Sequence, residues 1–479
     1  RFEVVESRTE KGLGFDPAGF SKAGNATCPF CGTVADIDYV KEEGWQGRMG
    51  EQMMAIVCTR PGRQGKIYLS VEQASSLLKS TGKMPVPPEE EIQKRIEALC
   101  RRAGLTVPSE PIANLPNDCR DNSLGITVRP YGLRTWGDLF TPRQMLCLLT
   151  FAAAVREAVG ELEREGVESE RAKAVGTYLG ILVNRLADYN STGCVFEVTG
   201  EFIAHTFGRQ ALPMVWDFAE LAPFGDGSGS PKGALDWIIG VAEAQVDTGI
   251  AAIVTRGSAT ALPWPDGIFD AVITDPPYYD NVPYADISDF FYVWLKRTIG
   301  HLYPEHFATD ATPKKQEAVA DAVRHGGSKE KARAAYEEMM AKAFAEANRV
   351  LKPGGQLTVV YAHKTTLGWS TLVDALRRAG FTVTEAWPLD TERPGRLREH
   401  GSAALASSIF LVARKREDVG GLKRESVGSY ENKVRPELER IVRERVDSLW
   451  KMGITGADLV IAAVGAGLRA FTRFSRVEY

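Results

Sequence analysis

The sequence lacks an excess of positive charge, and this argues against a protein that a global basic field draws to nucleic acid. Its 62 Asp and Glu residues outnumber its 58 Lys and Arg residues, so the formal net charge is −4. Any contact with DNA must therefore come from local patches.

Cysteines and long apolar runs are also scarce. Seven cysteines occur in 479 residues, and only Cys28 and Cys31 form a CxxC pair. This usage does not suggest a disulfide framework and fits a reducing compartment. We see neither an apolar run long enough to span a membrane nor a signal-peptide pattern. We therefore expect a cytoplasmic protein without a membrane partner.

Length and composition fit a globular chain with more than one domain. The chain is 44% hydrophobic and 25% charged, which is ordinary for a globular protein, and its length allows two or three domains. Turn signals and apolar periodicity divide it into four regions. These are a small β-rich unit at 1–75, a mostly helical region at 76–230, an α/β region at 231–416 and two C-terminal helices at 417–479.

Helix and strand signals are clear at several places. Thr141 followed by Pro142 predicts a helix start, because a threonine caps well and proline fits the first helical position. Phe290 and Trp294 belong to an aromatic stripe at helical spacing that we expect in the core. We expect helices at 89–103, 142–160, 169–189, 231–244, 330–350 and 370–379, and strands at 251–255, 271–273, 356–363, 381–387 and 407–414.

The strand predicted at 271–273 leads into the most informative stretch of the chain. The apolar run predicts a buried parallel strand, and it is followed by Asp275, Pro276, Pro277 and Tyr278. In open α/β sheets the ligand crevice lies beyond the carboxyl ends of the strands. The stretch is therefore expected at the position where ligands bind and react in such sheets.

These four residues can act as a clamp for an amine. The exocyclic amino group of adenine or cytosine is a poor nucleophile, because its lone pair is delocalised into the ring. Acceptors on its two hydrogens favour the pyramidal form that attacks a methyl donor. The Asp275 carboxylate and the Pro276 carbonyl can accept those hydrogens, and the prolines hold the acceptors in place. Tyr278 offers a flat face for base stacking. The alternative is a strand that ends in a proline turn with packing tyrosines.

Asp-Pro-Pro-Tyr is the catalytic motif of amino-group DNA methyltransferases, and the chain more closely resembles the adenine-specific DNA methylases that contain a zinc ribbon. The resemblance covers most of the chain, and it runs through the stretches at 25–32, 139–144, 214–220, 275–278 and 361–366. It implies an α/β class I methyltransferase sheet of the Rossmann-like kind. A zinc-ribbon-like unit precedes this sheet, together with a helical insertion.

The resemblance also implies a reaction, a cofactor and partners. The expected reaction moves a methyl group from S-adenosylmethionine to the exocyclic amine of a flipped base in DNA, with N6 of adenine expected in preference to N4 of cytosine. Further subunits of a modification or defence system are expected partners. Gly257, Ser258 and Ala259 stand where a turn contacts the adenine of the methyl donor, although Ser258 replaces the usual acidic residue.

Residues near the motif and at the next strand end are candidates for the target pocket. Tyr279, Asp280, Asn281 and Tyr284 follow on the same loop, and His363 and Lys364 emerge at the carboxyl end of the strand predicted at 356–363.

The expected sheet is incomplete at its N-terminal side. Class I methyltransferases begin with two strands, the first of which ends in a glycine loop, and we place neither strand in this sequence. In the resembled family the glycine motif precedes the zinc ribbon, and this chain begins at Arg1. We therefore expect a fragment that alone is poorly active or inactive.

Other functions remain open. The target could be N4 of cytosine, RNA or a protein amine, since related motifs act on several planar amines. The chain could also be a non-catalytic DNA-binding subunit of a modification or defence system. Replacement of Asp275 separates the enzyme from the binding subunit.

Zinc binding depends on ligands beyond the single CxxC pair. A structural zinc site needs four ligands, and Cys28 and Cys31 supply two. Cys58 stands alone in an apolar stretch, where a cysteine is usually a core residue. The second pair precedes Arg1, has been lost, or is replaced by scattered ligands. The resembled family often carries two pairs, which favours the first reading.

Two loops have both a functional and a structural interpretation. The glycine-rich stretch at 224–230 superficially matches a cofactor loop, but a lone glycine repeat is a weak signal and flexible surface loops have the same composition. The polar stretch at 300–328 contains Lys314, Lys315, Arg324 and His325. These residues would hold phosphates or form a solvated surface.

Overall fold

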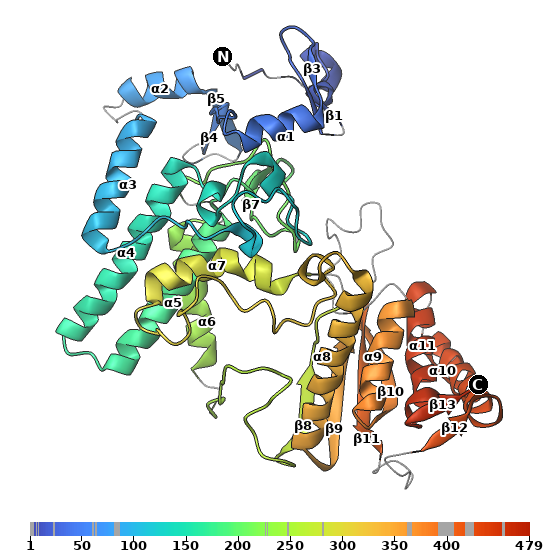
Figure 1. Ribbon diagram of the computed structural model, residues 1–479. Helices are drawn as coiled ribbons and strands as arrows, with labels where there is room; N and C mark the ends of the chain where they lie inside the picture. Colours follow the sequence, from blue (N-terminus) through green and yellow to red (C-terminus); the bar gives the residue numbers. More distant parts are fainter. Residues whose placement is uncertain are drawn as a thin grey trace. The chain divides into compact units, whose positions relative to one another are not determined.

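The computed structural model shows a mixed α/β protein, 47% helical and 17% strand, with several small sheets (Figure 1). It describes residues 4–5, 7, 9–22, 24–59, 62, 65–80, 87–225, 227, 229–246, 249–279, 282–361, 366–390, 407–416, 426–452 and 456–479. The chain forms two compact units. The first contains residues 1–251 and 284–314, and the second contains residues 252–283 and 315–479.

The first unit begins with short antiparallel strands. A three-stranded sheet is followed by helix α1 (Ile37–Trp45), a two-stranded hairpin and helix α2 (Val71–Ser80). The strands are β1 (Ser21–Lys22), β2 (Asn25–Thr27), β3 (Val34–Ala35), β4 (Ala55–Thr59) and β5 (Lys66–Ser70). A second hairpin, β6 (Val195–Glu197) with β7 (Phe202–Ala204), lies later in this unit.

Packed helices make up the rest of the first unit. They are α3 (Glu89–Ala103), α4 (Pro142–Arg164), α5 (Ser169–Asp188), α6 (Pro231–Gln245) and α7 (Tyr284–Ile299). The predicted helix start is confirmed, since Thr141 caps α4 by accepting a hydrogen bond from the Gln144 amide and Pro142 is the first helical residue. Phe290 and Trp294 are fully buried, which confirms the predicted aromatic core.

The second unit is built on a four-stranded sheet with the order β10-β11-β9-β8. Strands β8 and β9 are parallel, and β11 is antiparallel to both β9 and β10. The strands are β8 (Phe269–Thr274), β9 (Leu351–Tyr361), β10 (Phe381–Asp390) and β11 (Ser407–Lys415). These bounds confirm the four strands predicted from the motif onward.

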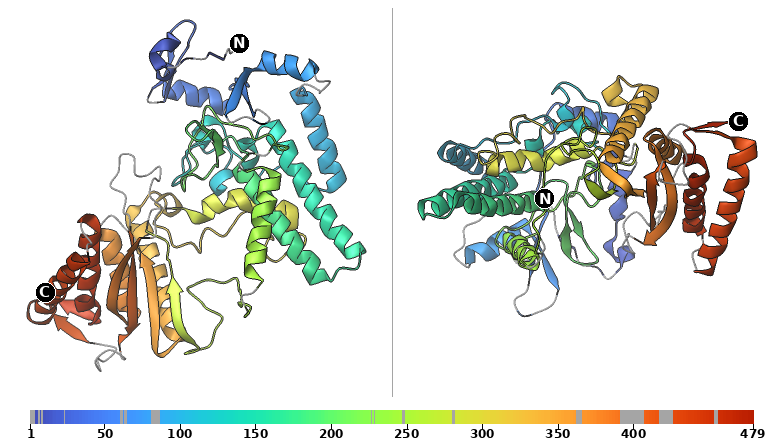
Figure 2. Two further views of the ribbon diagram at one scale, coloured as in Figure 1. Left: turned by 180° about the vertical axis from the view of Figure 1, so that it is seen from behind. Right: turned by 90° about the horizontal axis from the view of Figure 1, so that it is seen from below.

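Helices complete the second unit. They are α8 (Lys329–Val350), α9 (Thr366–Arg378), α10 (Arg435–Lys451) and α11 (Gly456–Thr472). A π-helical turn at Tyr430–Val434 precedes α10, and a short parallel pair joins β12 (Val427–Ser429) to β13 (Arg476–Glu478). The views in Figure 2 show α8 and α9 lying along the sheet.

The core of the second unit lies under one face of the sheet. Every second residue of β9 is buried from Leu357 to Tyr361, and so is every second residue of β11 from Ile409 to Ala413. These side chains form one apolar cluster with side chains of α8 and α9. Helix α11 approaches the same face at Gly465, where a Cβ atom would lie 2.9 Å from that of Ala386. A glycine is therefore needed for this close packing.

Two predictions about the strands are wrong in part or in whole. The strand predicted at 251–255 is absent, and Val254 is 90% exposed. Strand β8 is not fully buried, because Val272 joins the core whereas Ile273 is 75% exposed. Within the described ranges β8 pairs only with β9 and is an edge strand. A strand needs a neighbouring strand to pair with its backbone N–H and C=O groups. The apolar pattern of one segment does not show whether such a neighbour is present.

Within the described residues, no helix combines the length and apolar character needed to cross a membrane.

A buried arginine organises the loop between α3 and α4. Arg129 is fully buried, and its guanidinium donates hydrogen bonds to the carbonyls of Ile112, Arg134, Pro116 and Cys119 at 2.6–3.0 Å. Burial lowers the pKa of this side chain. This loop is thus wrapped around one cation that supplies its backbone acceptors with donors.

We predict that Arg129→Met destabilises the first unit by at least about 3 kcal/mol, because several buried carbonyls lose their donor. The measurement is urea unfolding followed by tryptophan fluorescence. Arg164→Met is the control, since Arg164 is exposed and donates one helix-end hydrogen bond to Gly160. Equal stability of the two variants would contradict the organising role of Arg129.

Candidate active site

The Asp-Pro-Pro-Tyr motif directly follows β8. Asp275 is exposed, Pro276 is buried and Tyr278 is half-buried. Because β8 and β9 are parallel, their carboxyl ends meet at the same edge of the sheet, where β9 ends at Tyr361. Among the described residues, no hydrogen bond or ion pair involves the Asp275 carboxylate. The side chain is therefore free to accept hydrogen bonds from a ligand.

An aromatic ladder holds Tyr278. Its ring packs edge to face on Tyr361, with centroids 5.2 Å apart, and Tyr361 packs in the same manner on Trp369 of α9. Tyr361 is fully buried, and its hydroxyl donates to the Gly368 carbonyl. The ring of Tyr278 is thus fixed against the core while part of it stays accessible.

Tyr336 of α8 anchors the two residues on either side of Tyr278. Its hydroxyl donates to the Pro277 carbonyl at 2.7 Å and accepts from the Tyr279 amide at 3.2 Å. Burial raises the pKa of Tyr336 to about 12, so the phenol remains a donor at neutral pH. The Pro277 carbonyl is therefore occupied, whereas no described group donates to the Pro276 carbonyl.

The other residues predicted for the target pocket have different outcomes. Tyr279 packs edge to face on Tyr336, so its ring belongs partly to the core. Tyr284 begins α7 in the first unit and is 50% exposed. Asp280, Asn281, His363 and Lys364 lie outside the described residues.

The turn predicted to contact the methyl donor closes on itself. The Ser258 hydroxyl accepts a hydrogen bond from the Thr260 amide at 3.2 Å and lies 2.8 Å from the Thr260 hydroxyl. Gly257 and Ala259 are exposed. The Ser258 hydroxyl is thus engaged within its own turn, and the exposed backbone on either side fits contact with a ligand.

An ion pair at the end of α8 anchors the chain that leaves this turn. Glu346 accepts from the Leu262 amide at 2.8 Å, and Arg349 donates to the carbonyls of Leu262 and Trp264 and to Glu346. Tyr336 and Glu346 lie ten residues apart on α8, a rise of about 15 Å. The structure therefore joins the turn and the motif through α8.

The contacts of the ionised Glu346 carboxylate make this anchor sensitive to acid. The hydrogen bond from Arg349, followed by that from Leu262, lowers the pKa of Glu346 from 4.5 to about 2. A lowered pKa in the folded state stabilises the fold above pH 4.5, and this contribution is lost as the pH falls towards 2.

We expect wild-type protein to lose more unfolding free energy between pH 4.5 and 2 than Glu346→Gln, which carries no carboxylate there. The measurement is the urea midpoint at each pH. Glu338→Gln is the control, because Glu338 is a more exposed α8 carboxylate that pairs with Arg378 without contacting the turn. Parallel pH profiles for wild type and Glu346→Gln would contradict the anchor.

The cysteine pair lies on the hairpin between β2 and β3. The Cys28 amide donates to the Thr33 carbonyl, and the Gly32 amide donates to the Cys28 carbonyl. Gly32 adopts φ +71°, which suits glycine in this tight turn. In the described part of the chain, no three His, Cys, Asp or Glu residues lie together as a metal-binding group. The described residues therefore do not fit a complete four-ligand zinc site.

The two cysteine environments predict different reactivity. Hydrogen bonds from the Thr33 hydroxyl and amide lower the pKa of Cys31, whereas burial raises the pKa of Cys147 to about 11. We expect iodoacetamide to label Cys31 well before Cys147 at pH 7.5, as read by peptide mass spectrometry. Thr33→Val should slow labelling of Cys31 and leave Cys147 unchanged. Labelling at equal rates would show that this prediction is wrong.

Most of the basic residues in the 300–328 stretch already contact a carboxylate or a carbonyl oxygen. Lys314 pairs with Asp289 at 2.5 Å and lies 3.9 Å from Asp286, and both carboxylates are buried. Arg324 pairs with Glu317 at 2.6 Å. Nδ1 of His325 lies 2.9 Å from the Asp321 carbonyl oxygen. These contacts favour the structural interpretation of this stretch, and Lys315 alone of the four is exposed.

Sequence reasoning missed the residues that support the predicted site. Tyr336, Glu346 and Arg349 carry no local signal, since each acts on a residue more than fifty positions away. The same holds for Arg143 and Glu220, whose two hydrogen bonds at 2.8 and 2.5 Å join the stretches at 139–144 and 214–220. Only co-variation between distant positions could have indicated such pairs.

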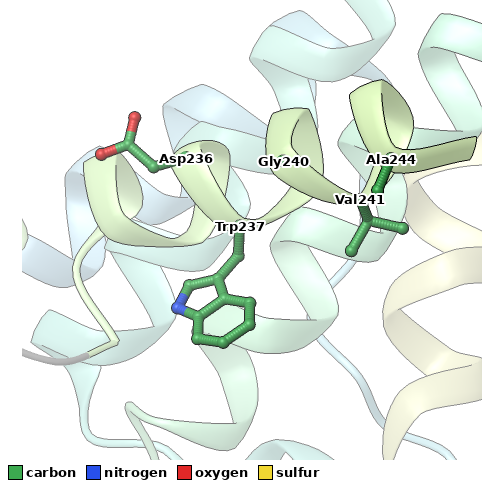
Figure 3. A pocket seen from close by; sticks show the side chains of 5 residues that line it. All are labelled: Asp236, Trp237, Gly240, Val241 and Ala244. Atoms are coloured by element: carbon green, nitrogen blue, oxygen red, sulfur yellow. The ribbon is translucent and has the colours of Figure 1, made fainter. Parts of the chain in front are cut away.

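A surface depression of about 400 Å³ lies on α6 in the first unit (Figure 3). One helix supplies its whole lining, and the side chains shown are apolar apart from Asp236 at one end. The lining residues are Asp236, Trp237, Gly240, Val241 and Ala244. It is an exposed helix face with none of the predicted site residues.

Comparison of the chain with protein-family models, with curated proteins and with solved structures finds no match.

Proposed function

We propose that this protein is an S-adenosylmethionine-dependent DNA methyltransferase that modifies the exocyclic amine of a flipped base, namely N6 of adenine. The observation that carries the proposal is the pair of acceptors after β8. The exposed Asp275 carboxylate and the Pro276 carbonyl have no donor among the described residues, and the anchored ring of Tyr278 follows them.

The chemistry of an aromatic amine fits this pair. One N–H of the flipped base would donate to Asp275 and the other to the Pro276 carbonyl, which favours a pyramidal nitrogen with an available lone pair. S-adenosylmethionine would supply the electrophilic methyl group, and the exposed backbone at Gly257 and Ala259 beside Ser258 would contact it. No cysteine lies between 195 and 479, so we propose direct transfer without a covalent enzyme intermediate.

The sheet order supports the class I assignment. The strands predicted at 271–273, 356–363, 381–387 and 407–414 are neighbours in the order β10-β11-β9-β8, and within the described ranges β8 has a strand neighbour on one side alone. We propose that further strands complete the sheet and that this chain without them transfers methyl groups poorly or not at all. DNA and subunits of a modification or defence system are the proposed partners, in the cytoplasm.

The decisive variant is Asp275→Ala in cells that express the gene encoding this chain. We expect methylation-aware sequencing to show a loss of at least about a hundredfold in modified adenine, because one of two preorganised acceptors is removed. DNA binding in a gel-shift assay should persist. Asp270→Ala is the control, since Asp270 is an exposed carboxylate of the same strand that pairs with Lys352.

Other outcomes select the other functions. Unchanged methylation in Asp275→Ala would overturn the enzyme assignment and favour a DNA-binding subunit. If the DNA contains modified cytosine and this modification disappears in Asp275→Ala, the target is N4 of cytosine. Modified RNA or protein with unmodified DNA would change the substrate.

A further inference from the structure

The loop that carries the proposed clamp contains an unfavourable backbone conformation. Tyr279 adopts φ +50°, a left-handed value that residues with a Cβ atom rarely adopt. Its amide is fixed in position because it donates to both the Tyr336 hydroxyl and the Pro277 carbonyl, each at 3.2 Å, and its carbonyl accepts from the Ala320 amide at 2.9 Å. Such a conformation persists where surrounding contacts determine it, and it is enriched at functional sites.

The position of Tyr336 makes it the main residue that holds Tyr279 in this conformation. It is 1% exposed and lies in the apolar cluster of the second unit, so its ring position is set by packing. Its hydroxyl bridges the Pro277 carbonyl and the Tyr279 amide. The peptide groups before and after Tyr278 are therefore tied to the same oxygen atom, while the ring of Tyr278 rests on Tyr361.

We propose that Tyr336 is a positioning residue for the Asp-Pro-Pro-Tyr site. Its hydroxyl holds the turn in the conformation that orients Tyr278, and it shares the Pro277 carbonyl with the Tyr279 amide. The Asp275 carboxylate and the Pro276 carbonyl then remain as the two acceptors for the amine. The effect on methyl transfer rests on the proposed function, whereas the effect on the turn does not.

Tyr336→Phe tests the hydroxyl alone, because the ring is retained. Tyr303→Phe is the matched control, since it also removes one partly buried hydroxyl hydrogen bond, to Thr177 in the first unit. Each protein is purified from cells that express the gene, with any subunits that accompany it. Amide hydrogen exchange of Tyr279 and Ala320 is measured together with methylation kinetics on adenine-containing DNA.

In Tyr336→Phe we expect exchange at Tyr279 to accelerate at least about tenfold and kcat to fall by up to about a hundredfold, because a small misplacement of catalytic groups is costly. KM for DNA should change less than about threefold. A role in general stability alone would instead lower the urea midpoint and leave kcat per folded molecule unchanged. Tyr303→Phe should change neither exchange at Tyr279 nor kcat.

Two results separate the failure of this inference from that of the proposed function. Unchanged exchange at Tyr279, or a kcat equal to that of Tyr303→Phe, overturns the positioning role. Methylation that is absent in the wild-type protein purified together with the strands that complete its sheet, or unchanged in Asp275→Ala, overturns the proposed function, and hydrogen exchange then decides alone whether Tyr336 holds the turn.

Discussion

Parallel pairing of β8 with β9 is the constraint on which the candidate site depends. It brings the residues that follow β8 to the edge where β9 ends, so that Asp275 and Tyr278 stand beside Tyr361. The connection between the two strands includes α8, which packs on the same face of the sheet as α9. One helix can therefore anchor the motif through Tyr336 and the preceding turn through Glu346. The geometry of the site is a consequence of this strand–helix–strand unit.

Local signals in the sequence predicted most of the elements that carry the site. The Thr141–Pro142 start of α4 and the α8 helix follow from capping and apolar period, which depend on residues a few positions apart. The motif itself was found because its four residues are contiguous and follow a strand. These features are encoded within short windows, so that tertiary structure was not needed to read them.

Features that depend on contacts between distant residues could not be predicted from these short windows of sequence. The apolar run at 251–255 has the composition of a strand, but it has no strand neighbour among the described residues and stays irregular and exposed. Ile273 was expected inside, but side chains alternate along a strand, so that Val272 packs on the core and Ile273 points to the opposite face, where it is exposed. Tyr336 acts on residues 57 and 59 positions away, and Glu346 acts across 84 positions. Residue composition and apolar periodicity do not indicate contacts between residues so far apart in the sequence.

Charge compensation limits where nucleic acid could bind. Lys314 and Arg324 already pair with carboxylates that are mostly shielded from water, so a phosphate could use them only by displacing those partners and leaving buried charge behind. The net charge of −4 supplies no general attraction to compensate for this cost. Recognition of a base at Asp275 would then depend on stacking against Tyr278 and on hydrogen bonds to fixed acceptors. Those interactions would require an ordered turn, and the buried Tyr336 hydroxyl, which contacts the Pro277 carbonyl and the Tyr279 amide, would support that order.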